Sequence, residues 1–239
     1  MMSKYFSLSR NDFYSIIVVT PLFILYQILG FFNNYESDLI VKNSADVFIR
    51  HFFQHFSLKH AGLIHLICFM LIISFIVFKN KDLFISSELK LSFLFGMIAE
   101  SFLHSISLLV LMSLTYKLLP LSIFLFNNHI MENIYLSIGA GIWEELLFRY
   151  FLISFLLFIF NKIMYDFSSL SYIMIIIISS ALFSYYHFIG IYSDIINISI
   201  FVYRFIAGII LSIIFIFRGL GIAVYTHTFY DLYLVVFGS

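Results

Sequence analysis

The chain has 239 residues, of which 62% are hydrophobic and only 11% are charged, and its mean hydropathy is +1.05. A soluble domain of this length could not bury so much apolar surface in one core, so the composition indicates a membrane protein with several spans. The formal net charge of zero argues against a basic face for nucleic acid, and the single cysteine, Cys68, excludes a disulfide framework and a cysteine-based metal cluster.

The predicted fold is all-α, a polytopic transmembrane helical bundle of about seven spans, because long apolar runs recur and strands of alternating polarity are missing. The first run is too long for a signal peptide and lacks a small-residue cleavage site, so we expect it to be retained. The fourth would be about 42 Å long as a helix, which predicts either a tilted helix or a span with an amphipathic extension. The expected spans are residues 14–32, 61–78, 91–116, 133–160, 168–189, 195–217 and 219–237.

We divide the chain into an N-terminal transmembrane region, residues 1–132, and a second transmembrane region, residues 133–239, which holds the motifs described below. Between the first two spans, Phe48, Phe52 and Phe56 share one helical face, which predicts either an interfacial helix or an extension of the second span. Most Lys and Arg residues of the loops fall on the same side of the membrane as the N-terminus, which predicts that the N-terminus is cytoplasmic. The Phe-, Ile-, Tyr- and Asn-rich composition suits a low-GC bacterium, so we expect a bacterial cytoplasmic membrane.

Ionisable residues inside the predicted spans are few, and such residues normally face a bundle interior or a water-filled cavity because lipid solvates them poorly. Two of them, Glu100 and His104, are four residues apart in the third span, and we expect them mainly to pair with each other. The complete set is Glu100, His104, Glu144, Glu145, Arg149, His187, Arg204, His227 and Asp231.

Two adjacent glutamates in the fourth span are expected to differ in role. At about 100° per residue, Arg149 lies about 40° from Glu145 and about 140° from Glu144 on an α-helix, so Glu145 can pair with Arg149 while Glu144 points elsewhere. One carboxylate is then neutralised and the other is left for chemistry. The alternative is that both glutamates only neutralise buried arginines, Arg149 and Arg204.

The later spans add two histidines. His187 follows Phe183 by four residues near the end of the fifth span, where it is either a base or an ordinary polar residue at the membrane interface. His227 and Asp231 are also four residues apart, near the middle of the last span, and form either part of a site or a self-satisfied pair.

In this order, Glu-Glu-x-x-x-Arg, Phe-x-x-x-His and His-x-x-x-Asp resemble the motifs of the CPBP family, which comprises type II CAAX prenyl proteases and bacteriocin-processing (Abi-type) enzymes. Glu144, Glu145 and Arg149 match the first motif, while Phe183 and His187 match the second. His227 matches the third motif, in which Asp231 stands where Asn is commoner.

The resemblance implies an intramembrane glutamic endopeptidase that acts on a membrane-associated peptide or protein. Glu144, assisted by His187, would activate a water, and His227 with Asp231 would stabilise the oxyanion. Glu145 and Arg149 would brace the helix, with Phe183 in support. Because an ionised Asp only accepts hydrogen bonds, Asp231 must either be protonated or orient His227. We expect no cofactor, no metal and no nucleic-acid partner.

Other functions stay open at this stage. Two histidines with Asp and Glu could bind Zn²⁺ in an intramembrane zinc protease, although the usual His-Glu-x-x-His signature is missing. A catalytically silent membrane scaffold or regulator with the same fold is a further alternative, because buried carboxylates and histidines also occur outside enzymes. The histidine-rich stretch 51–65 resembles a rhomboid protease locally, but no Gly-x-Ser-Gly nucleophile follows it.

Overall fold

The computed structural model describes residues 2–32, 61–79, 81–86, 89–118, 130–163, 169–189 and 195–237. Within these residues the regular secondary structure is entirely helical, which confirms the predicted all-α fold class. The proposed interfacial helix with Phe48, Phe52 and Phe56 lies outside the described residues. The helices are α1 (Met2–Ser9), α2 (Asp12–Phe32), α4 (Ala61–Lys79), α5 (Lys81–Ser86), α6 (Leu91–Leu118), α7 (Ile130–Glu144), η1 (Glu145–Ile153), α8 (Ser154–Ile163), α9 (Ser169–Tyr186), α10 (Ile198–Arg218) and α11 (Leu220–Phe237).

In the described part of the chain, five helices are long and apolar enough to cross a membrane, namely α2, α6, α9, α10 and α11. They coincide with five of the predicted spans, with boundaries that shift by a few residues. Helix α4 occupies the predicted second span, and its described apolar part runs from Leu66 to Lys79. The chain is therefore an integral membrane protein.

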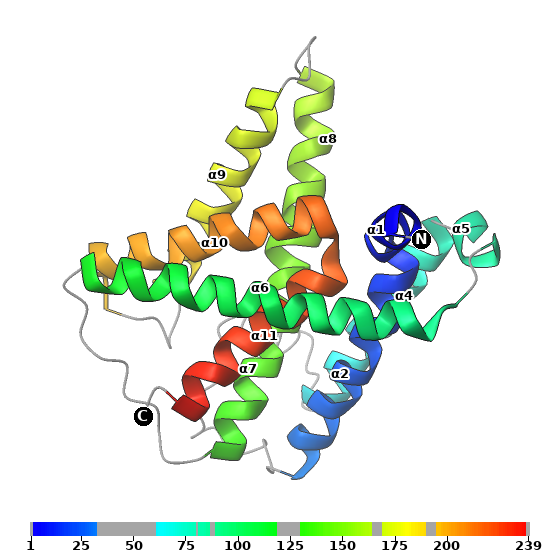
Figure 1. The fold of residues 1–239 in the computed structure, drawn as a ribbon, viewed down its shortest axis with the longest axis horizontal. Helices are drawn as coiled ribbons and strands as arrows, with labels where there is room; N and C mark the ends of the chain where they lie inside the picture. Colours follow the sequence, from blue (N-terminus) through cyan, green and yellow to red (C-terminus); the bar gives the residue numbers. More distant parts are fainter. Residues whose placement is uncertain are drawn as a thin grey trace.

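The fourth predicted span is one continuous helical rod, in which the π-helix η1 joins α7 to α8 (Figure 1). The rod extends beyond the predicted residues at both ends, from Ile130 to Ile163. Helices α8 and α9 form a hairpin on one side of the molecule, and α6 and α10 cross its middle (Figure 1). Helix α9 packs against η1 and α8, so its C-terminal end meets the middle of the rod.

Helix α11 is the central element, because it packs against α2, α6, α7, α10 and η1. Most of its side chains are buried, from Leu220 to Thr228 without interruption. A helix enclosed by other helices can carry polar side chains that lipid would not solvate. The fold therefore places His227, in α11, where neighbouring helices shield it from the bilayer.

Candidate active site

The change from α-helix to π-helix occurs between the two glutamates: Glu144 is the last residue of α7 and Glu145 the first of η1. A π-helix disrupts the i→i+4 ladder, and such segments recur at functional sites. Here Ser179 of α9 donates a hydrogen bond of 2.9 Å from its hydroxyl to the backbone carbonyl of Phe148. Helix α9 thus satisfies part of the backbone of the segment that presents the glutamates.

Glu145 and Arg149 form a fully buried ion pair, with Arg149 Nη1 3.0 Å from Glu145 Oε1. This is the pairing that the spacing of four residues predicts. The guanidinium also lies over the ring of Phe183, with Cζ 4.2 Å from the ring centroid, which is a favourable cation–π arrangement away from water. Phe183 therefore links α9 to the paired charges in η1.

Glu145 has a second contact, which the sequence does not predict. Its Oε1 lies 2.8 Å from Nδ1 of His227. Because a carboxylate paired with arginine only accepts hydrogen bonds, Nδ1–H is the donor, and the other ring nitrogen, Nε2, points away from Glu145. The residue expected only to brace the helix also orients the histidine of α11.

Glu144 faces both histidines. Its Oε1 lies 3.8 Å from Nε2 of His187, and its Oε2 lies 4.0 Å from Nε2 of His227. These distances are too long for direct hydrogen bonds but fit one bridging water. His187 is held from behind, because its Nδ1 lies 3.0 Å from the backbone carbonyl of Phe183.

Asp231 lies on the same side of His227 as Glu144, with Oδ2 3.5 Å from Nε2. The predicted proximity within the His-x-x-x-Asp motif is therefore present. The closer contact to the ring is nevertheless that of Glu145, at 2.8 Å. The sequence leaves two roles open for Asp231, a protonated donor or an orienting group for His227. In the structure Glu145 contacts Nδ1 of the ring, while Asp231 and Glu144 both approach Nε2.

The ionisable groups open onto one cavity of about 650 Å³, a size within the usual range for ligand sites. Glu144, His187, His227 and Asp231 all line it, together with Arg204 of α10. Most of the exposed wall is apolar. The apolar and aromatic part comes mainly from α6, α10 and α11, and includes Leu108, Met112, Tyr203, Ala207, Leu211 and Leu234.

Close packing of α7 on α11 brings Glu144 within reach of His227. Gly141 lies one turn before Glu144, and a Cβ atom there would sit 2.0 Å from Thr228 Oγ1 and 3.0 Å from the backbone carbonyl oxygen of Val224. Only glycine permits this approach. A glycine at position 141 is therefore needed for Glu144 to lie this close to His227.

Residues 126–233 match the family model of the Rce1-like type II CAAX prenyl endopeptidases, a segment that covers a little under half of the chain. Over these residues the chain is similar to the CAAX protease family. All seven predicted site residues lie inside the matched segment, whereas helices α1 to α6 precede it. No curated protein and no solved structure matches the chain significantly.

The similarity to the CAAX protease family suggests protease activity. The roles of individual residues remain expectations at this point, because the match concerns the segment and not single side chains. Among the described residues, no group of three or more His, Cys, Asp or Glu side chains is arranged to hold a metal ion. The absence of a metal requirement stays a prediction to be tested with chelators.

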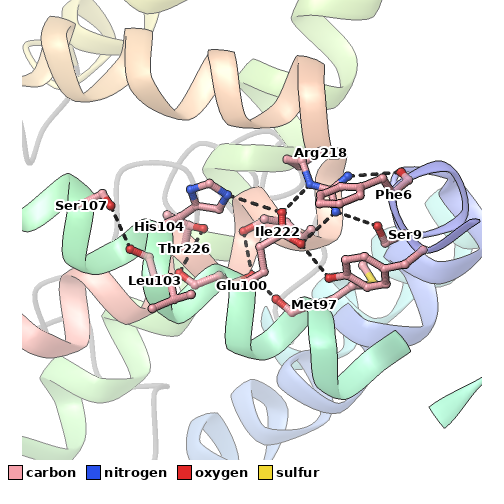
Figure 2. Close-up of polar contacts among 12 residues, drawn as sticks. Phe6, Ser9, Met97, Glu100, Leu103, His104, Ser107, Arg218, Ile222 and Thr226 are labelled. Atoms are coloured by element: carbon pink, nitrogen blue, oxygen red, sulfur yellow. Dashed lines mark hydrogen bonds and ion pairs between the residues drawn. The ribbon is translucent and has the colours of Figure 1, made fainter. Parts of the chain in front are cut away.

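Glu100 and His104 lie elsewhere, as expected. His104 Nε2 is 3.5 Å from Glu100 Oε1, and neither residue belongs to the cavity lining. The carboxylate of Glu100 also bonds Arg218 and Tyr5 (Figure 2). From the sequence, Arg218 falls in the short loop between the last two predicted spans. No spacing rule connects it with Glu100, so the sequence does not predict this ion pair.

Proposed function

We propose that the protein is an intramembrane glutamic-type endopeptidase, which hydrolyses a peptide bond of a membrane-associated peptide or protein. The observation that carries the proposal is the position of Glu144 between the Nε2 atoms of His187 and His227, at 3.8 and 4.0 Å. A general base and its partner must lie within hydrogen-bond reach or one water of each other. The matched protease family supports the same reaction class.

His187 and Glu144 hold the attacking water. Because the carbonyl of Phe183 only accepts hydrogen bonds, Nδ1 of His187 carries the proton and its Nε2 faces Glu144 as an acceptor. A water between them donates one O–H to Glu144 and the other to His187. Its oxygen lone pairs are then free to attack the scissile carbonyl carbon. Glu144 takes the proton and returns it to the leaving nitrogen when the C–N bond breaks.

His227 stabilises the oxyanion that forms on the scissile carbonyl. Its Nδ1 donates to Glu145, and its Nε2 faces Asp231 and Glu144. Three carboxylates at the site face two guanidiniums, those of Arg149 and Arg204, so an imidazolium at His227 balances the remaining negative charge. The Nε2–H of an imidazolium is the donor that an oxyanion needs.

Glu145 and Arg149 hold this constellation together. Each is completely buried, and Glu145 contacts both Arg149 and His227. Glu145 therefore fixes the ring of His227 from behind, while Arg149 provides the counter-charge for its carboxylate. A rigid support of this kind reduces the cost of reorganisation during the reaction.

The cavity suits an apolar segment of a membrane-associated peptide. Its walls are mostly apolar, and the few polar groups gather around Glu144. A peptide that enters can bury apolar side chains against α6 and α10 while its scissile carbonyl reaches the polar end. We propose that the enzyme acts in a bacterial cytoplasmic membrane.

The test uses full-length protein reconstituted into lipid vesicles with a pool of apolar peptides, in water enriched in ¹⁸O. We expect products whose new carboxyl group contains one ¹⁸O atom, which mass spectrometry detects. Glu144→Gln should give no products. Glu132→Gln, the same substitution in the first turn of α7, is the matched control and should cleave like the wild type.

The alternatives have distinct outcomes in this experiment. A membrane scaffold would yield no ¹⁸O-labelled product from the wild type and would keep its cellular phenotype in Glu144→Gln. A zinc protease would lose its activity on treatment with a chelator and regain it with added zinc. The glutamic mechanism predicts labelled products that are insensitive to the chelator.

A further inference from the structure

A second polar cluster holds α11 at the end opposite to Asp231. It consists of Glu100 and Ser101 of α6, Arg218 at the end of α10, and Tyr5 and Ser9 of α1. We call these five residues the α11 anchor, of which Glu100, Arg218 and Ser9 are labelled in Figure 2. All of them lie outside the cavity, and four of the five precede the segment that matches the CAAX protease family.

Arg218 is the centre of the anchor. It is followed by Gly219, which ends α10 with a φ of +85°, and α11 begins at Leu220. The guanidinium bonds Glu100 through both Nε and Nη2, and Nη2 also donates to the hydroxyl of Ser9 at 2.8 Å. Tyr5 donates to the same carboxylate at 2.6 Å. The corner that starts α11 is thereby tied to two other helices.

Ser101 extends the contact along α11. Its hydroxyl lies 3.3 Å from the carbonyl oxygen of Ile222, and its own carbonyl accepts a hydrogen bond of 3.4 Å from Thr226. Ile222 and Thr226 are four residues apart in α11, and Thr226 directly precedes His227. Residues at this spacing form one stripe on a helix. The α11 anchor thus fixes the position of α11 along its axis and its rotation about that axis, as far as His227.

We infer that Glu100 is a positioning residue, which sets the placement of His227 relative to Glu144 through Arg218 and α11. The inference rests on the proposed function. Helices in lipid are not held together by the hydrophobic effect, so close packing and interhelical polar contacts determine how they align. Loss of the Glu100 charge leaves Arg218 unbalanced and frees the start of α11. The Nε2 atom of His227, 4.0 Å from Glu144, then leaves its working position.

The kinetic test uses Glu100→Gln and a matched pair of serine variants. Ser101 and Ser107 both donate to the carbonyl four residues earlier in α6, but only Ser101 also reaches α11. We expect Glu100→Gln to lower kcat about ten- to a hundredfold, because small displacements of catalytic groups have effects of this size. KM should stay within about twofold, since substrate contacts lie in the cavity. Ser101→Ala should lower kcat less, and Ser107→Ala should match the wild type.

A spectroscopic readout keeps the test independent of activity. Full-length protein with ¹⁵N-labelled histidine in lipid nanodiscs gives ring resonances, among which His227 is identified by its loss in His227→Gln. We expect Glu100→Gln and the milder Arg218→Lys to shift the His227 resonances, and Ser107→Ala to leave them in place. Unchanged His227 resonances in both anchor variants, or a kcat per folded molecule equal to wild type, would overturn the inference. A wild type that cleaves nothing would instead reject the proposed function, while the resonances still test the anchor.

Discussion

Glu145 lies with one carboxylate oxygen 2.8 Å from Nδ1 of His227, and the same oxygen is 3.0 Å from Nη1 of Arg149. One buried carboxylate thus connects a structural cation in η1 with the candidate oxyanion donor in α11. Its neighbour Glu144 approaches the other nitrogen of the same ring. Both glutamates therefore approach His227: Glu145 supports the ring, and Glu144 is left for the proposed chemistry.

This division predicts opposite phenotypes for the two Glu→Gln variants. Glu145→Gln leaves Arg149 buried without its counter-charge, so we expect a loss of about 3–5 kcal/mol in the free energy of unfolding. Glu144→Gln should retain the wild-type melting temperature and lose cleavage. Thermal unfolding and turnover, measured on the same purified preparations, check both. A stable, inactive Glu145→Gln together with an unstable Glu144→Gln would show that the roles are reversed.

Asp231→Asn tests whether residue 231 acts as a charge. Asp231 lies 3.5 Å from Nε2 of His227, and an ionised carboxylate there favours the imidazolium that binds the oxyanion. We expect the amide to lower kcat and to leave KM unchanged. If Asp231 instead donates a proton of its own to the oxyanion, the amide also donates, and turnover should be retained or improved.

Gly141→Ala tests the close approach of α7 and α11. The added Cβ would meet the Thr228 side chain at 2.0 Å and backbone at 3.0 Å, so we expect a loss of about 1–3 kcal/mol in stability and a lower kcat. Combining it with Thr228→Ala removes the nearer obstacle and should restore part of both. A double variant no better than Gly141→Ala would show that the backbone contact alone sets the cost.

Phe183→Leu removes the ring that lies over the Arg149 guanidinium. The cation–π contact is shielded from water, so its loss should cost about 2 kcal/mol of stability beyond the change in packing. Phe148→Leu is the control, because Phe148 packs edge-on against the same ring. Equal losses of stability in the two variants would indicate that only aromatic packing matters at position 183.

The sequence predicts the helical class, most of the spans and the Glu145–Arg149 pair, because apolar runs and a spacing of four residues have direct geometric meaning in helices. It does not predict η1, since no Gly or Pro occurs in residues 145–153 and one carbonyl of this π-helix is satisfied by Ser179, far along the chain. From the predicted boundaries, Glu144 and His187 should lie at different depths. They meet because the rod is longer than expected and α9 ends at its middle.

Contacts between distant segments explain the other differences. The bond between Glu145 and His227 joins η1 to α11, and only tertiary packing decides which carboxylate reaches which ring nitrogen. The same holds for Arg218 and Glu100, which are 118 positions apart. Local spacing identifies the candidate residues, whereas the arrangement of helices assigns their partners.

The most direct test of the central claim, that Glu144 and His187 hold one water between them, is a double-mutant cycle on kcat with Glu144→Gln and His187→Asn. General acid–base groups typically contribute about 10²–10⁴-fold each. If both act on the same water, the double variant should be no slower than the slower single variant, because residues that act as a unit are not additive. Losses that multiply in the double variant would show that the two side chains act independently, and would contradict the proposed mechanism.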